Sequence, residues 1–69
     1  QPVYRYGLSV REMEVLRYVA AGLADKQIAS RLEISTYTVN KHVGAILMKM
    51  NASSRTHAGV RAVQEGLLP

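Results

Sequence analysis

Apolar residues recur along the chain at the spacing of amphipathic helices, and the first such stretch begins just after Ser9. Ser9 and Glu12 form a Ser-x-x-Glu pattern, which is typical of a capping box: each side chain satisfies a backbone N–H group at the start of a helix. The apolar positions that follow at i, i+3, i+6 and i+7 are Met13, Leu16, Val19 and Ala20. Gly22 is well placed to end this helix, because glycine readily adopts the left-handed conformation just beyond a C-terminus.

Two further helices are predicted on either side of a short turn. The first covers residues 25–32 and begins without a capping side chain, because Ala24 precedes it. The turn is residues 33–35, and Ser35 caps the next helix, which covers about residues 36–50. The predicted inward residues of the first of these helices are Ile28, Ala29 and Leu32. Those of the second, spaced by four, three and four, are Val39, Val43, Ile46 and Met50.

The opposite face of the helix over residues 36–50 differs in character. At 100° per residue, it collects Tyr37, Asn40, Lys41, Gly44 and Met48. Asparagine and lysine side chains are suited to hydrogen-bond base edges, asparagine to adenine and lysine to guanine acceptors. Gly44 has no evident packing role on an outer face, and either close approach to DNA or simple tolerance explains it. We expect Met48 to pack beside the next helix.

A fourth helix is predicted from Ser54 to about Glu65, with Gly66 as its stop. Its inward residues are expected to be Ala58, Ala62 and Val63. Because no segment has the alternating pattern of a strand, the predicted fold class is all-α, a four-helix bundle. Residues 1–7 show no periodicity and are expected to be the end of a linker from a longer protein, whereas residues 8–68 form the domain.

Charge is distributed unevenly along the chain. The formal net charge is +4, and no acidic residue occurs from Ile34 to Gln64. A half of the chain whose charged residues are all positive suggests a surface that binds phosphates. With no cysteine and two isolated histidines, the sequence predicts no metal site and no cofactor. It contains no nucleophile–base pair, phosphate-cradling glycine loop or membrane-spanning run, so neither an enzyme nor a membrane protein is expected.

The helices over residues 25–32 and 36–50, with their turn, meet the mechanical requirements of a helix-turn-helix. Ala29 is small at the point where the two helices approach closely. On spacing alone a plain helical bundle is also possible, and so is a protein-interaction module that uses the helix over residues 36–50 as its docking surface. The polar groups on the outer face favour double-stranded DNA as the partner.

The order of motifs from Leu8 to Leu68 resembles the LuxR-type (GerE-like) helix-turn-helix domain, the C-terminal effector domain of bacterial transcription regulators. Seven segments carry the resemblance. They are Leu8-Ser9-Val10-Arg11-Glu12, Val15-Leu16, Ala21-Gly22-Leu23, Lys26-Gln27-Ile28-Ala29-Ser30-Arg31-Leu32, Ile34-Ser35-Thr36-Tyr37-Thr38-Val39-Asn40-Lys41-His42, Ile46-Leu47-Met48-Lys49-Met50 and Ser54-Arg55-Thr56-His57-Ala58. The resemblance implies a four-helix fold whose third helix reads the major groove. It also implies a homodimer on DNA that pairs through the fourth helix.

Site residues follow from the resemblance position by position. Base contacts fall on Asn40, Lys41 and Gly44, with Tyr37 on the same groove-facing surface. Phosphate contacts fall on Lys26, Arg31, Thr36, Thr38 and Lys49. The dimer surface falls on Ala58, Ala62 and their neighbours.

The resemblance extends to partners and location. It implies an N-terminal receiver or other sensor domain, RNA polymerase as a further partner, and a place in the bacterial cytoplasm at the nucleoid. Three positions depart from the usual pattern: Ala24 replaces a capping residue, Gly44 replaces a longer polar side chain, and His57 replaces an acid.

Overall fold

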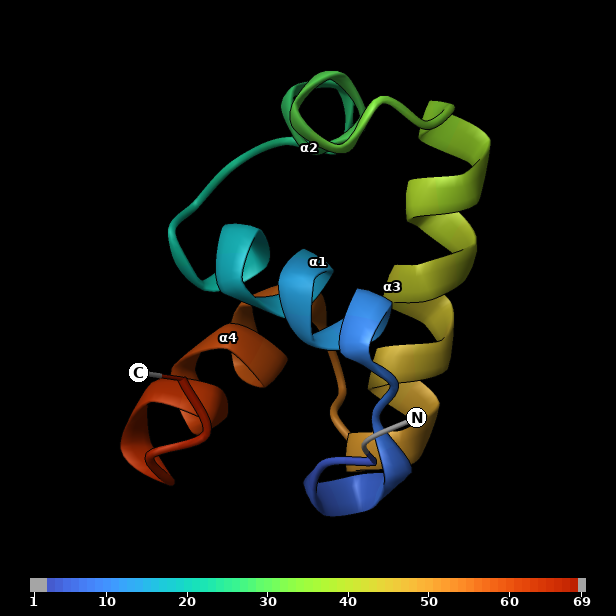
Figure 1. Cartoon of the computed structure of the whole chain (residues 1–69). Coiled ribbons are helices and arrows are strands. Elements are labelled where there is room, and N and C mark those ends of the chain that lie inside the picture. The colour runs from blue at the N-terminus through green and yellow to red at the C-terminus, as the bar shows by residue number, and fades with distance from the viewer. Residues whose placement is uncertain (1–2, 69) are drawn as a thin grey trace.

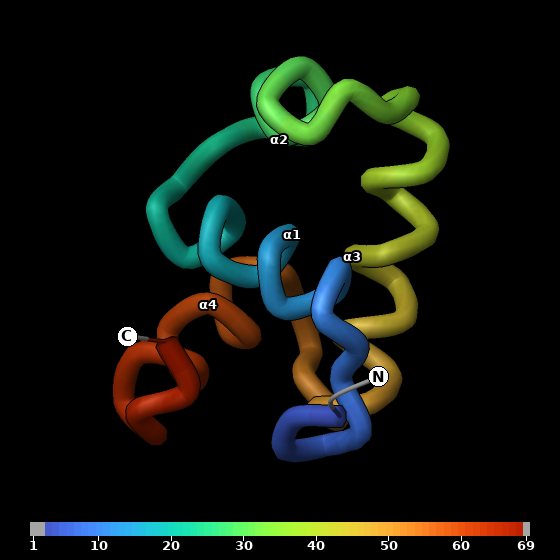
Figure 2. The backbone as a smooth tube through the Cα atoms, viewed as in Figure 1, coloured from blue at the N-terminus to red at the C-terminus, as the bar shows by residue number. Residues whose placement is uncertain are grey.

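A computed structural model describes residues 3–68 as four α-helices preceded by one short 3-10 turn (Figures 1 and 2). The elements are η1 (Arg5–Gly7), α1 (Val10–Ala20), α2 (Asp25–Leu32), α3 (Thr36–Met50) and α4 (Arg55–Gln64). In Figure 1, α3 runs down one side of the molecule from α2 to η1, and α1 lies between α3 and α4. Within the described residues there is no strand, so the all-α, four-helix prediction is confirmed.

The core lies where α1 meets the other helices. Leu8, Leu16 and Ile46 are fully or almost fully buried, at 0%, 0% and 1% exposure. The predicted α3 stripe of Val39, Val43, Ile46 and Met50 is buried throughout. Burying one such aliphatic side chain stabilises a fold by about 1.5–3 kcal/mol, so the stripe fixes how α3 is rotated about its axis. The rotation of α3 in turn decides which residues face outward.

The predicted helix ends are confirmed. The Ser9 hydroxyl accepts the Glu12 N–H at 3.1 Å while Glu12 Oε1 accepts the Ser9 N–H at 2.9 Å. Gly22 has φ +88°, a left-handed conformation that only glycine adopts without strain. Ala24 contributes no side-chain cap, but its own N–H donates to Gln27 Oε1 at 2.8 Å, which supplies half of a capping box.

The segment before Leu8 is not a free linker where the structure describes it. Leu8 is fully buried, and the turn η1 that precedes it is fastened to the end of α4. Arg5 donates to the Glu65 carbonyl at 3.2 Å, and the Tyr6 hydroxyl contacts both Glu65 and Arg61. These contacts are long-range and polar, so the local pattern of the sequence could not predict them. Residues 1–2, also expected to be linker, lie outside the described residues.

Two side chains lie elsewhere than predicted. Val63 was expected to face inward from α4 but is 64% exposed. Met48 was expected to pack beside α4 but is 77% exposed. Because Ala58 and Ala62 already fill the buried face of α4, Val63 is turned outward, and Met48 lies opposite the buried stripe of α3.

Candidate nucleic-acid interface

The corner between α2 and α3 positions the whole site. Glu33 ends α2 in a left-handed conformation at φ 56°, and the Ile34 N–H returns to the Ala29 carbonyl at 3.0 Å. Ser35 then begins α3, because its hydroxyl accepts the Thr38 N–H at 3.1 Å. Ala29 is 6% exposed, as expected for a small residue at a close crossing. The predicted helix-turn-helix is therefore present in the fold.

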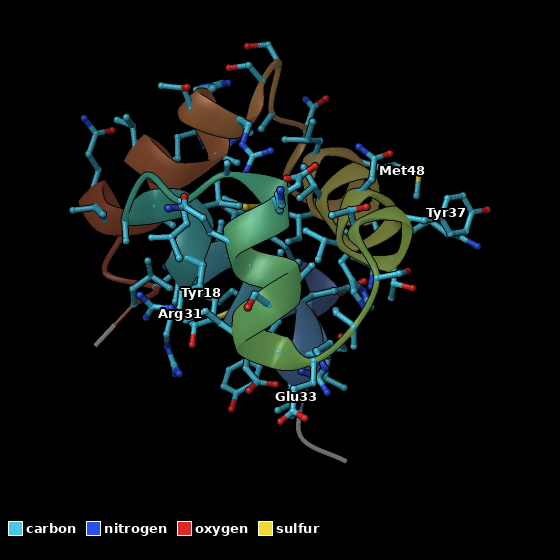
Figure 3. All side chains as sticks on the ribbon, turned by 90° about the horizontal axis from the view of Figure 1, so that it is seen from above. Tyr18, Arg31, Glu33, Tyr37 and Met48 are labelled. Carbon is cyan, nitrogen blue, oxygen red and sulfur yellow. The ribbon has the colours of Figure 1, made fainter. Side chains whose placement is uncertain are left out.

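The outer face of α3 points away from the other three helices. In the view of Figure 3, Tyr37 and Met48 project outward from α3 on the same side, away from α2. The exposed residues on this face are Tyr37, Asn40, Lys41, Gly44 and Met48. The structure thus brings together the four residues predicted to face the groove and adds Met48 to them.

Lys41 and Tyr37 are coupled on that face. The Lys41 ammonium lies over the Tyr37 ring, 5.6 Å from its centroid, a cation–π geometry one helical turn apart. An exposed contact of this kind contributes about 0.5–1 kcal/mol, enough to bias the lysine rotamer without fixing it. The Lys41 side chain is therefore held close to the helix face and stays accessible.

Three of the five predicted phosphate contacts are exposed, namely Lys26, Arg31 and Thr36, and the other two, Thr38 and Lys49, make hydrogen bonds within the domain. Lys26 and Arg31 are exposed on α2 and line a shallow hollow with Gln27 and Ser30. The Arg31 guanidinium also lies 5.8 Å from the centroid of the Tyr18 ring, and both are labelled in Figure 3. Thr36 is exposed at the start of α3.

Thr38 is already engaged within the helix cap. It is half-buried, and its hydroxyl shares a 2.9 Å hydrogen bond with the Ser35 hydroxyl. A hydroxyl keeps further donor and acceptor capacity after one bond, so Thr38 remains compatible with a phosphate contact.

Lys49 is exposed, but its ammonium group is bound to α1 and to the turn before it. Its Nζ donates to Glu12 Oε1 at 2.7 Å and to the Gly7 carbonyl at 3.1 Å. Burial of Glu12 alone would raise the pKa of its carboxyl, but the hydrogen bonds from Lys49 and Ser9 outweigh that effect, so the pKa lies below its ordinary value. Contact with a phosphate would require Lys49 to leave this pair or to share its donors. Sequence reasoning missed the pair because its partners are 37 residues apart.

The dimer residues carried over from the resemblance are not accessible. Ala58 and Ala62 are 1% and 0% exposed, because they form the face of α4 that packs into the domain's own core. The exposed apolar residues of α4 are instead Val60 and Val63, at 48% and 64%. They line a mainly apolar hollow between α4 and the end of α1. Its lining is Val19, Ala20, Gly22, Thr56, Gly59, Val60, Val63 and Gln64.

Two arginines that could have been phosphate ligands act as internal ties. Arg55 donates to Asp25 Oδ1 at 2.5 Å and to the Leu23 carbonyl at 3.0 Å, which links α4 to the first residue of α2 and to the loop before it. Arg61 donates to the Met50 carbonyl at 2.6 Å and to Glu65.

These polar contacts also shift two pKa values. Hydrogen bonds from Tyr6 and then Arg61 lower the pKa of Glu65. Hydrogen bonds to Tyr6 and Glu65 raise the pKa of Arg61. The carboxylate and the guanidinium are therefore both held in their charged forms.

Ion pairs with the acidic residues account for some of the basic side chains and leave the others without a carboxylate partner in the described range. Glu12, Glu14, Asp25 and Glu65 each contact a lysine or arginine. Among residues 3–68, the basic side chains without a carboxylate partner are Arg17, Lys26, Arg31 and Lys41. Three of these four lie on α2 and α3, and Glu33 in the turn between them is the one acid of the described range without an ion pair, so the unpaired charges of the helix-turn-helix are positive in excess.

In the described range, no three His, Asp or Glu side chains converge as a metal site would require. No helix of residues 3–68 combines the length and apolar character needed to cross a membrane.

Comparison with known proteins places the chain in a family. Residues 7–62 match the profile of the bacterial regulatory proteins of the LuxR family, GerE. The chain is 47% identical over 58 residues to the uncharacterized transcriptional regulatory protein YxjL of Bacillus subtilis, a match over 84% of this chain and 27% of that protein.

Two further relatives are named as response regulators. The nitrate/nitrite response regulator NarP of Escherichia coli is 45% identical over 58 residues, covering 84% of this chain and 27% of NarP. The response regulator VraR of Staphylococcus aureus is 41% identical over 61 residues, covering 88% and 29%. The chain thus spans less than a third of the length of each of these relatives. By fold and by sequence, the chain belongs to the LuxR (GerE) family of bacterial transcription regulators, as their helix-turn-helix DNA-binding domain.

Proposed function

We propose that this domain binds double-stranded DNA sequence-specifically, with α3 in the major groove. The observation that carries the proposal is the outer face of α3, where the side chains of Asn40 and Lys41 are exposed and make no hydrogen bond or ion pair within residues 3–68. These side chains offer the donors and acceptors that adenine and guanine edges require in the major groove. Tyr37 and Gly44 complete the surface that faces the bases.

Phosphate contacts on both sides of the groove fix the position of α3. Lys26 and Arg31 on α2 are exposed cations without a carboxylate partner in the described range, and Thr36 and Thr38 offer hydroxyls at the start of α3. Phosphate contacts set orientation and affinity but carry no sequence information. Lys49, the fifth predicted contact, is held by Glu12 and the Gly7 carbonyl and would have to leave them to reach a phosphate.

The fourth helix supplies a contact between two copies of the domain. Val60 and Val63 are exposed beside an apolar hollow, and apolar side chains in such a place gain from being covered. A two-fold pair through α4 would present two α3 helices to successive turns of one DNA face, as dimeric helix-turn-helix proteins do.

The proposal extends to the whole protein. NarP and VraR are named response regulators, and this chain matches only about a quarter of each. We therefore infer an N-terminal receiver domain that controls this domain, with RNA polymerase as a further partner and the bacterial cytoplasm, at the nucleoid, as the location.

Selection of bound duplexes from a random library tests the proposal. We expect a recurring short motif, repeated as a palindrome if α4 pairs two copies. Recovery of a motif by the wild-type domain and loss of that motif with the double variant N40A/K41A would support the role of α3. Recovery of unrelated sequences by the wild type would contradict sequence-specific binding. That result would favour the alternative, in which α3 is a docking surface for another protein.

A further inference from the structure

The centre line of the outer face of α3 is apolar or bare rather than polar. At 100° per residue, Tyr37, Gly44 and Met48 fall within about 40° of one another, and Lys41 and Asn40 lie to either side. Tyr37 is 71% exposed and Met48 is 77% exposed. Figure 3 shows both side chains projecting from the same side of α3 into open space.

Met48 has no role inside the domain that would explain its presence. The other two methionines, Met13 and Met50, are 4% and 1% exposed and fill the core. Met48 packs in no part of that core, although it is as long and apolar as they are.

Gly44, one turn before Met48, has no internal role either. A Cβ atom built on Gly44 would meet no atom within 4 Å. Glycine in the middle of a helix is less favourable than alanine, and no internal contact of α3 requires it here. The two residues together form a bare backbone patch followed by a flexible apolar side chain, on the surface that faces the bases.

The major groove contains one apolar feature with which such a surface can pair. Every base edge in the groove presents hydrogen-bond donors or acceptors, and thymine adds a C5-methyl group. A methyl group packs favourably against a thioether side chain, which adapts its shape through three rotatable bonds. Gly44 leaves room for the DNA to come close enough for that contact.

We propose that Met48 is a specificity-determining residue that recognises thymine through its C5-methyl group, with Gly44 providing the close approach. The inference rests on the proposed insertion of α3 into the major groove and names a feature of the operator. Met48 lies seven residues after Lys41, about 10 Å along the helix, which is longer than a single base-pair step of about 3.4 Å. The methyl-sensitive thymine is therefore separated from the base that Lys41 contacts.

Replacement of thymine by deoxyuridine tests the inference, since it removes only the methyl group. Each thymine of the duplex obtained by selection is replaced singly, and affinity is measured for the wild type, M48A, M48L and M48Q. For the wild type, one replacement should weaken binding by about fourfold, the equivalent of one buried methyl group. M48L should keep that sensitivity, whereas M48A and M48Q should bind the two duplexes almost equally.

The possible outcomes are distinct. Loss of the deoxyuridine effect in M48A and M48Q with retention in M48L supports the inference. A preferred duplex whose deoxyuridine penalties are the same in the wild type and M48A overturns it, while the proposed function stands. Failure of the wild type to prefer any duplex overturns both. Circular dichroism of each variant should match the wild type, because position 48 is exposed.

Discussion

Lys49, in the last turn of α3, donates a 2.7 Å hydrogen bond to Glu12, in the first turn of α1. The same carboxylate oxygen accepts the Ser9 N–H, so one acid both caps α1 and ties it to α3. The side chains of Glu12 and Lys49 are 10% and 33% exposed, which shields the pair from solvent. The contact fixes α3 against the rest of the domain at the end remote from α2.

The Glu12 carboxylate should make stability depend on pH. Because its folded pKa is lowered, its contribution is fully present above the unfolded value of about 4.3 and is lost as pH falls through the folded pKa. E12Q keeps the acceptor oxygen and removes the charge, so we expect a loss of about 1 kcal/mol in the free energy of unfolding at pH 7. Urea unfolding of both proteins from pH 7 to pH 3 measures this difference.

The difference between wild type and E12Q should shrink below about pH 4, as the wild-type carboxyl takes up a proton. Glu65 also has a lowered pKa, but it titrates in both proteins and cancels in the comparison. A difference that stays constant down to pH 3 would contradict the assigned role of the charge.

Salt dependence separates Lys49 from the other predicted phosphate ligands. Each neutralised phosphate contributes a slope of about −0.9 in a plot of log K against log salt concentration. K26A and R31A should each reduce the magnitude of the slope by about 1. K49A should leave the slope unchanged, because Lys49 is held on Glu12, and should lower the free energy of unfolding instead. A slope reduced by K49A as much as by K26A would show that DNA draws Lys49 away from Glu12.

The helices and the buried face of α3 could be predicted from the sequence, because caps and periodic apolar residues are local signals. The pairs Lys49–Glu12 and Arg55–Asp25 could not, because each joins residues at least 30 positions apart. The orientation of α4 was predicted only in part: Ala58 and Ala62 face inward as expected, but Val63 does not. Ala58 and Ala62 are buried as its periodicity suggests, and for that reason they cannot also form the surface that family resemblance suggested.

The two helical glycines should respond oppositely to alanine. G44A adds a Cβ in open space, so helix propensity should raise the free energy of unfolding by about 0.5–1 kcal/mol. In G59A the added Cβ would lie 3.1 Å from the Ala20 Cα, and overpacking against backbone costs about 1–3 kcal/mol. Thermal unfolding of both variants measures the two changes in the free energy of unfolding. Destabilisation by G44A would mean that Gly44 has a structural role.

The proposed contact between two copies through α4 should affect binding only to DNA that contains two half-sites. V63E places a charge on an exposed apolar residue without disturbing the core, because Val63 is 64% exposed. On a duplex with two half-sites, we expect V63E to abolish cooperative binding, while affinity for a single half-site stays unchanged. Gel-shift titrations on both duplexes measure this, with V10A on α1 as a control. Equal cooperativity in V63E and wild type would exclude this face of α4 as the dimer contact.

The exposed residues on the outer face of α3 could be predicted from the sequence, because the buried stripe of α3 defines that face. The free charge of that surface was predictable only in part, since it depends on which acids are paired. The acids at positions 12, 14, 25 and 65 pair with basic side chains, and this leaves Lys26, Arg31 and Lys41 free of carboxylate partners in the described range. The pairs Arg11–Glu14 and Arg61–Glu65 are local in sequence, whereas the partners of Glu12 and Asp25 became visible only in three dimensions.

The most direct test of the central claim compares K41A with R17A on the selected duplex and on a random duplex. Both variants remove one free cation, but Arg17 lies on α1, outside the helix-turn-helix. We predict that K41A weakens binding to the selected duplex by about 1–3 kcal/mol more than to the random one, whereas R17A changes both equally. Equal losses on the two duplexes for K41A would contradict the reading of bases by α3.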